Sequence, residues 1–472
     1  MRSCYESYTT NFANSYLYAT ETIYCSKYLP FITAELSYAR IKALASCPEV
    51  EAIGYDAEDE WDETLEPVDS PLSSTSIPPQ YYTIADTIED MGIDDIWADG
   101  AEGQSVNVGI IDVGIPNVGH TVFSGLTIYT QYAYSERPSA HASAMLEIIS
   151  CMAPEATFYC TTHNSPGDRK TALEWLIENS VYVINISASF GGGATYYNQY
   201  EQGEYILDQY VSAYNVTIIK SSGNVGTTGV NPGGLSYNAI VVGDYNRYSD
   251  IINPISSYYS NNIYANKPDI CAQGYFVSSF PNESTGNYYS PGTSNATAFT
   301  TGVVALLLTF RGHLREQPAT VKAIVTAGVD IISTDHHYVP ADFADYQQYG
   351  AGVLNPTRAY EITCDMSYLN NYCSITSDGN SHTVILTAGQ TTRISLVFLR
   401  ACRIYDESPI YDLSNLDLYV YDPSGNYVDS SITTNNNVEI VEFMSTTSGN
   451  YTIMVTNEYS DTITFYSISW TQ

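Results

Sequence analysis

Hydrophobic positions between residues 85 and 362 alternate between short apolar runs and stretches with helical spacing. Four apolar runs are rich in β-branched residues, which is typical of strands buried on both faces, and they span residues 106–112, 181–187, 216–221 and 239–242. Between them, residues 168–179 and 204–215 repeat apolar positions at the helical period. The alternation predicts βαβ units, and therefore an α/β fold whose parallel sheet is covered by helices. The ligand crevice of such a sheet lies beyond the carboxyl ends of its strands.

The pattern changes after about residue 375, where apolar and polar residues alternate and no helical spacing remains. Turn residues such as Pro423 to Asn426 separate the alternating segments, which span residues 382–389, 393–399, 416–422, 438–443, 451–456 and 463–470. Short strands at this spacing predict a β-sandwich over residues 375–472.

The first part of the chain predicts a small α+β unit followed by a linker. Residues 36–45 have helical spacing, the Cys47-Pro48 pair ends that pattern, and residues 50–55 alternate as a strand does, so residues 1–58 form the predicted unit. The segment at 59–84 is acidic, rich in Ser and Pro, and without apolar period in most of its length, as expected of an exposed linker. We therefore expect the α/β domain to span residues 85–362.

Charge excludes some classes of partner. The chain has 17 Lys and Arg against 52 Asp and Glu, a formal net charge of −35, whereas nucleic acids and anionic membranes are bound through clustered basic residues. Because 44% of residues are hydrophobic and only 15% are charged, the chain is expected to be globular. No run of about 18 apolar residues predicts a membrane span, and the N-terminus lacks the apolar core of a secretory signal.

The nine cysteines form no C-x-x-C pair and no Cys/His cluster with zinc spacing, so we expect no metal ligation by them. An odd number cannot pair completely. Cys364 and Cys373 are close enough in sequence for a local bridge, but the cysteines leave the redox compartment undecided.

Four polar residues stand where chemistry is plausible, although each also has an ordinary structural explanation. Asp112 ends an apolar strand, and His141 begins a helical stretch flanked by small residues. Ser294 precedes an apolar helix, so that helix N–H groups and the helix dipole favour negative charge beside it. Asn224 follows the strand at 216–221. Taken singly, each is better explained as a turn, capping or other structural residue.

Taken together, the blocks that contain these residues resemble the subtilases, the subtilisin-like serine proteases. VGIIDVGI holds Asp112, HASAMLEIISCMAPEA begins at His141, SSGNVG holds Asn224 and GTSNATA holds Ser294, in the order of that family. VINISASFGGG and KPDICAQG resemble two further family blocks, and YGAGVLNPTRAYE resembles the end of the catalytic domain. The resemblance covers about residues 85–362 and implies a subtilisin-like fold.

The resemblance implies a serine endopeptidase that acts on proteins or peptides and needs no cofactor for its chemistry. Ser294 would be the nucleophile, His141 the general base, Asp112 the residue that orients the imidazole, and Asn224 a donor to the oxyanion. The residues implied in binding the substrate backbone are Ser187, Ala188, Ser189, Phe190, Gly191, Ser221, Ser222 and Gly223. A structural calcium ion is compatible with the family, but no site is assigned; Asp417, a strand-end residue expected to face water, is a weak candidate.

Three departures from the family pattern favour weaker or more selective activity. Ala142 and Ala144 stand where the histidine motif usually has glycine and a second histidine, and Ala298 stands where the serine motif usually ends in proline. The main alternative is therefore a subtilase-fold binding protein with little or no turnover. An esterase of the α/β-hydrolase fold would require a G-x-S-x-G elbow with histidine last, and the chain has neither. The other histidines considered as the base are His120, His163, His336 and His337, which lie in no matching block.

The flanking segments fit the same family. Residues 32–56 resemble the second half of a subtilase propeptide, so the N-terminal segment is expected to inhibit the enzyme and to be removed by self-cleavage within the acidic linker. The C-terminal β-sandwich resembles domains appended to secreted proteases. These flanks favour an extracellular or cell-surface protein, whereas the missing signal sequence favours an intracellular protein or a precursor that begins before residue 1.

Overall fold

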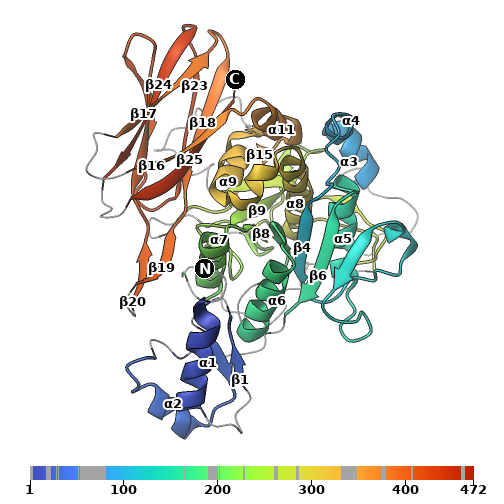
Figure 1. Ribbon diagram of the computed structural model, residues 1–472. Coiled ribbons are helices and arrows are strands. Elements are labelled where there is room, and N and C mark those ends of the chain that lie inside the picture. Colours follow the sequence, from blue (N-terminus) through green and yellow to red (C-terminus); the bar gives the residue numbers. More distant parts are fainter. Residues whose placement is uncertain are drawn as a thin grey trace.

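The computed structural model describes residues 4–17, 23–27, 29, 31–50, 53, 81–163, 165–189, 200, 202–226, 229–259, 264–282, 286–330, 348–373, 379–405, 408–458 and 463–471. An α/β region occupies the centre of the molecule, a β-sandwich lies at one end, and a small N-terminal unit lies at the other (Figure 1). The fold class predicted from the sequence, a parallel sheet covered by helices with a small α+β unit and a β-sandwich, is confirmed.

The central sheet has the strand order β14-β15-β11-β9-β8-β7-β4-β6-β5, and β10 pairs with β9. Apart from β14 and β10, which are antiparallel to their neighbours, its strands are parallel. The strands are β4 Asn107–Asp112, β5 Thr127–Thr130, β6 Thr157–Thr162, β7 Val183–Ile186, β8 Thr217–Ser221, β9 Ile240–Asn246, β10 Ile251–Ile252, β11 Ile270–Gln273, β14 Val329–Asp330 and β15 Val353–Leu354. Because β4 lies between β6 and β7, the chain turns to opposite sides of β4, and a crevice is expected at this switch point.

Helices cover both faces of the sheet, which explains why its strands appear in the sequence as continuous apolar runs. Ile110 of β4 packs in one core with helices α5, α8 and α9, whereas the next residue, Ile111, packs in a second core with α6 and α7. The helices of this region are α3 Ile84–Asp90, α4 Ile93–Ala98, α5 Ala140–Met152, α6 Pro166–Glu178, α7 Gln202–Tyr214, α8 Thr293–Phe310, α9 Pro318–Ala327 and α11 Pro356–Cys364.

Helix α6 begins two residues before the predicted start. Ser165 caps it by accepting the Asp168 N–H at 3.2 Å, and Pro166 occupies the first turn, where its missing N–H costs nothing. Periodicity alone did not reveal this capping sequence.

Helices α5 and α8 cross at a close contact. A Cβ on Gly302 of α8 would lie 2.5 Å from the Cβ of Met152 of α5, so only glycine allows this approach. Helix α8 has the length and hydropathy of a membrane-crossing helix, but 83% of it is buried inside the described part of the fold. Those properties are therefore explained by its place in the core.

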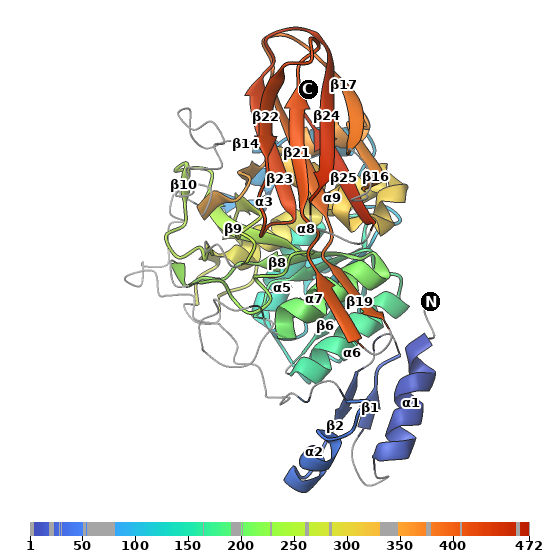
Figure 2. The ribbon, with the colours of Figure 1, turned by 90° about the vertical axis from the view of Figure 1, so that its left-hand side faces the viewer.

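The C-terminal sandwich consists of two four-stranded antiparallel sheets, β16-β25-β18-β23 and β17-β24-β21-β22. The six predicted strands are present, and β16, β19, β20 and β22 are additional; β19 and β20 form a hairpin that lies along α7 (Figures 1 and 2). The strands are β16 Tyr368–Cys373, β17 Asn380–Leu386, β18 Thr391–Phe398, β19 Ala401–Tyr405, β20 Ser408–Asp412, β21 Leu416–Tyr421, β22 Tyr427–Ser431, β23 Val438–Met444, β24 Gly449–Asn457 and β25 Thr464–Trp470.

Two sequence interpretations in this region were wrong. Cys364 is a free thiol, so the bridge considered between it and Cys373 is not formed. Asp417 is only 5% exposed rather than facing water, and burial and the charge of Glu458 raise the pKa of its carboxyl to about 6.

The N-terminal unit comprises helix α1 Cys4–Tyr16, a hairpin of β1 Ile23–Cys25 and β2 Ile32–Ala34, and helix α2 Tyr38–Leu44. The predicted helix at 36–45 is present as α2, while most of the predicted strand at 50–55 and nearly all of the linker lie outside the described residues. The β1–β2 hairpin of this unit, rather than its helices, faces the α/β region near α6 and α7 (Figure 2).

Helix α9 joins the α/β region to the sandwich, and all ten of its residues are buried. On its sheet side, Lys322 Nζ donates to the carbonyls of Tyr237 and Ala239 and lies 2.9 Å from the Asp269 carboxylate. On its sandwich side, the Thr326 hydroxyl forms a hydrogen bond of 2.7 Å with the Ser395 hydroxyl. The contacts on both sides make α9 part of both cores.

We expect Lys322→Met to lower the free energy of unfolding by about 3 kcal/mol, because it removes one of the two buried ammonium groups that pair with Asp269 and leaves that carboxylate with Lys267 alone. Burial lowers the pKa of the Lys322 ammonium to about 7. Urea unfolding at pH 6, where this group is charged, measures the loss of stability. The exposed Lys42 supplies the matched control, and Lys42→Met should change stability by less than about 0.5 kcal/mol. Equal stability of the two variants would contradict the structural role given to Lys322.

Candidate active site

Asp112 and His141 form a close pair at the carboxyl edge of the sheet. Asp112 is the last residue of β4 and is fully buried, and its Oδ1 lies 2.7 Å from His141 Nδ1 and accepts the Val113 N–H at 2.8 Å. His141 is held in the first turn of α5, where the cap residue Ser139 accepts the Ala142 N–H. The imidazole side chain is 25% exposed, so one edge meets the carboxylate and the ring still reaches the pocket that it lines.

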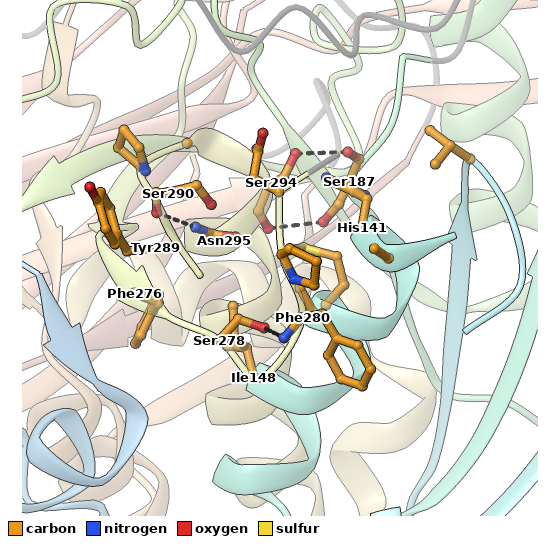
Figure 3. Close-up of a pocket in the computed structure, with 18 of the residues that line it drawn as sticks. His141, Ile148, Ser187, Phe276, Ser278, Phe280, Tyr289, Ser290, Ser294 and Asn295 are labelled. Carbon is orange, nitrogen blue, oxygen red and sulfur yellow. Dashed lines mark hydrogen bonds between the residues drawn. The ribbon is translucent and has the colours of Figure 1, made fainter. Parts of the chain in front are cut away.

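Ser294 lies in the first turn of α8 and lines the same pocket as His141 (Figure 3). Its Oγ donates to the Ser187 carbonyl at 2.9 Å, and Ser187 Oγ donates in return to the Ser294 carbonyl at 3.0 Å. A hydroxyl has a single proton to donate. The Ser294 proton is therefore directed at Ser187 here, and the hydroxyl must turn before it can give that proton to the imidazole.

Asn224 is oriented by the residue that precedes Ser294. Its Oδ1 accepts both the Thr293 N–H at 3.0 Å and the Thr293 hydroxyl at 3.1 Å, so its amide NH₂ is turned the other way. Gly223 N–H donates to the same Thr293 hydroxyl. Asn224 lines the pocket beside Ser294, whose own N–H belongs to the first turn of α8, where helix N–H groups lack intrahelical partners. Together these donors favour negative charge at this point.

The pocket encloses about 920 Å³ of empty space, its open mouth included. One wall comes from α5, and a second from the segment after β7, Ser187 to Ser189. The third is built by strands β12 Phe276–Val277 and β13 Tyr289–Ser290 and the residues around them. Strand β3 Tyr82–Thr83 pairs with β12 and braces that wall from outside.

The other predicted site residues are distributed as follows. Ser187, Ala188 and Ser189 line the pocket, and Phe190 and Gly191 lie outside the described residues. Three more predicted residues, Ser221, Ser222 and Gly223, are not among its lining residues; Ser221 ends β8.

The alternative histidines lie away from the pocket or outside the described residues. His120 caps the short 3-10 turn Thr121–Phe123 and packs against Phe280, and His163 is fully buried. Neither lines the pocket, and His336 and His337 lie in a part of the chain that the structure does not describe.

Sequence reasoning missed the third wall of the pocket and a buried acid behind it. The sequence YFVSSF at 275–280 and the NYYS at 287–290 contain the aromatic residues of that wall, but only the β12–β13 pairing brings them together. Asp244 of β9 lies behind Gly274, where a Cβ would be 2.1 Å from Asp244 Oδ1, and the Gly274 carbonyl holds the Asn295 amide next to Ser294.

The described residues contain no group of three or more His, Cys, Asp or Glu side chains that could hold a metal ion. The absence of a required cofactor and the presence of a structural calcium ion both stay predictions.

The geometry defines a class: an α/β protein with an Asp–His pair, a helix-borne serine and an amide donor at one sheet edge. Residues 133–352 match the model of the subtilase family, peptidase S8, and residues 378–457 match the bacterial pre-peptidase C-terminal domain. The chain therefore carries a subtilase domain followed by a pre-peptidase C-terminal domain, and the resemblance stated from its sequence is confirmed.

Individual proteins are more distant. Subtilisin DY of Bacillus licheniformis is 26% identical over 154 residues, which are 29% of this chain and 53% of that protein, so the chain spans about half the length of this curated relative. The solved structure of the prenylagaramide maturation protease PagA overlaps with a TM-score of 0.47 at 22% identity, covering 57% of this chain and 97% of that one. The patellamide maturation protease PatA gives a TM-score of 0.45 at 19% identity, with 56% and 98% covered.

Asp244 should make stability depend on pH. Burial raises the pKa of its carboxyl to about 7, against the opposing effect of the Asn253 amide. The unfolded chain releases this proton near pH 4 and the folded protein near pH 7, so stability is lost as pH rises from about 4 through 7. Asp244→Asn should be free of this loss, which amounts to up to about 4 kcal/mol on this shift. Urea unfolding at pH 5 and pH 8 tests it, and parallel changes in both proteins would refute it.

Proposed function

We propose that this protein is a serine endopeptidase in which Ser294, His141 and Asp112 act as a catalytic triad. The observation that carries the proposal is the contact of 2.7 Å between buried Asp112 and His141, on the pocket that also holds Ser294. Membership of the matched residues in the subtilase family supports the same reaction.

In the proposed reaction, the Ser294 hydroxyl leaves the Ser187 carbonyl and gives its proton to His141 as its oxygen bonds to the scissile carbonyl carbon. Asp112 keeps Nδ1 protonated, so that the other ring nitrogen is the base, and it stabilises the imidazolium that forms. The Asn224 amide and the Ser294 N–H stabilise the oxyanion. His141 then gives the proton to the leaving amine as the carbon–nitrogen bond breaks, and water releases the acyl group by the same steps.

The substrate is proposed to bind as an extended strand. When the Ser294 hydroxyl turns away, the Ser187 carbonyl becomes available to a substrate N–H group at the reaction centre. The segment from Ser187 to Gly191 and the turn from Ser221 to Gly223 would then supply the edges between which the peptide lies. Backbone pairing of this kind accepts many sequences, so side-chain pockets must provide the selectivity.

One observation favours the alternative of a weak or inactive binding protein. The proton of the Ser294 hydroxyl is donated to Ser187 rather than directed at the imidazole. In the absence of substrate, however, catalytic hydrogen bonds are often misaligned and form only in the complex. Reactivity toward a mechanism-based probe separates the two functions.

A fluorophosphonate probe should label Ser294, and Ser294→Ala should abolish both labelling and peptide hydrolysis. Asn224→Ala should lower kcat by about 10²- to 10³-fold, which is the effect that removing one oxyanion donor has in subtilisin. Asn426→Ala, in an exposed turn of the sandwich, is the matched control and should not change kcat. Mass spectrometry locates the label, and a folded wild-type protein that stays unlabelled after its N-terminal unit has been removed would favour the binding function.

We further propose that the N-terminal unit is an intramolecular inhibitor that the enzyme removes. It is docked on α6, where Glu174 accepts the hydroxyls of Tyr24 and Ser26 and Lys170 lies 3.9 Å from the centre of the Phe31 ring. Leu29 is buried among the residues of α6 and α7. Tyr81 follows the linker in sequence, and its ring centre lies 4.8 Å from that of Tyr289 in the pocket wall. The chain after the linker therefore begins beside the site.

Purified protein should therefore shorten on standing, with new ends between residues 56 and 80, because Tyr81, which follows the linker in sequence, lies beside the site that would cut it. Ser294→Ala protein should keep its full length under the same conditions. Intact-mass measurement over time follows the change. Equal shortening of both proteins would assign the cut to a different protease.

We also propose that the protein acts outside the cell or at its surface. The propeptide-like segment and the pre-peptidase C-terminal domain support this location.

A further inference from the structure

One part of the pocket continues from His141 along the helix that carries the imidazole. Ala144, Met145 and Ile148 follow His141 at three, four and seven residues, which places them on the same face of α5. All three line the pocket, and Figure 3 shows Ile148 and Phe276 at its inner end, away from Ser294.

The direction matters because the imidazole gives its proton to the leaving amine. The acyl half of the substrate stays bonded to Ser294, whereas the leaving half must have its nitrogen next to the His141 ring. A pocket that continues from the imidazole along α5 is therefore on the side of the leaving half. We call it the leaving-group pocket and define it by Ala144, Met145, Ile148, Phe276, Phe280 and Tyr289.

The leaving-group pocket is apolar and contains no fixed charge. Among the described residues that line the whole depression, none is Asp, Glu, Lys or Arg. Met145, Ile148 and Phe276 are each only 1% exposed and form its base. A charged side chain placed there would lose its hydration without gaining a partner, whereas an apolar side chain would lose only unfavourable contact with water.

Two polar side chains at this pocket, Glu147 and Asn295, are already used to hold its walls. Glu147 of α5 is 4% exposed and accepts the Ser278 hydroxyl at 2.6 Å and the Ser279 N–H at 2.8 Å, which ties the end of β12 to the helix of His141. Asn295 donates its amide to the carbonyls of Gly274 and Ser290 and so fixes the end of β13. These bonds leave the aromatic rings as the surface that a substrate would meet.

The walls are braced from behind, so the pocket is preformed. The Phe280 ring stacks on the Phe123 ring with 5.5 Å between the ring centres, and the Tyr289 ring packs on the Tyr81 ring with 4.8 Å between the centres. Because the walls are already ordered, binding a substrate does not cost the entropy of ordering them. The apolar contacts of the substrate therefore contribute more fully to the binding free energy.

We propose that this enzyme selects its substrates mainly through a large apolar residue on the leaving side of the cleaved bond, held in the leaving-group pocket. Ala144 is the residue that keeps the entrance open next to the imidazole, and Glu147 is a positioning residue for the opposite wall. This inference rests on the proposed function.

The test compares peptides that share one acyl-side sequence, obtained from a cleaved library peptide, and carry Leu, Phe, Gly or Asp directly after the cleaved bond. The p-nitroanilide of the same acyl sequence shows whether each protein is an active protease. We expect kcat/KM for Leu or Phe to exceed that for Gly by about 10- to 200-fold, the range for filling an apolar pocket, and Asp to be the poorest.

Two variants with opposite effects address the pocket itself. Ala144→Phe fills it and should bring the Leu-to-Gly ratio close to one, whereas Ile148→Ala enlarges it and should shift the preference from Leu toward Phe. Each ratio is taken between two peptides within the same variant, so a general loss of activity cancels. Ile385→Ala, at a 70% exposed position on the sandwich, should leave both ratios unchanged.

The outcomes separate the two proposals. Hydrolysis of the anilide with all leaving residues accepted within about threefold, or with Asp preferred, overturns the pocket assignment and leaves the protease standing. Absence of anilide hydrolysis together with absence of fluorophosphonate labelling overturns both. Ratios that move in Ile148→Ala and not in Ile385→Ala support the assignment even where Ala144→Phe fails to fold.

Discussion

The packing of α5 on α8 is the contact on which the candidate site depends, because each helix carries one residue of the proposed triad in its first turn. The contact is close, since Gly302 leaves no side chain between α8 and Met152 of α5. Both helices rest on the sheet, where Asp112 ends β4 and Asn224 lies in the turn just after β8. A larger residue in place of Gly302 would push the helices apart and separate the imidazole from the hydroxyl.

The central sheet and its helices could be predicted because burial on both faces leaves a strong pattern. Strands β4, β7, β8 and β9 were found within a few residues of their ends, since each is a continuous run of apolar residues. Strands β1 and β2 have three residues each, which is too few for any period to be recognised. Strand β16 exposes three of its six residues and lacks the alternation that identified its neighbours.

The site was predictable in its residues more than in its geometry. The local motifs that place Asp112, His141, Asn224 and Ser294 are contiguous in sequence, whereas the aromatic wall depends on β3, β12 and β13 meeting from distant segments. The direction of the Ser294 hydroxyl is a choice between side-chain rotamers, and no sequence pattern records it. The buried acid Asp244 was missed for a similar reason, because its importance comes from Gly274 and Asn253 lying around it.

Helix α9 holds the two matched domains together through side-chain contacts as well as through the chain that links them. Because its side chains bond to the sheet on one side and to β18 and β25 on the other, a nick in the chain after Cys373 would not by itself release the sandwich. The pieces would migrate apart only under denaturing conditions and would otherwise stay together as one particle. Swapping the appended module for that of a relative would accordingly require the hydroxyl partners on α9 to be exchanged with it.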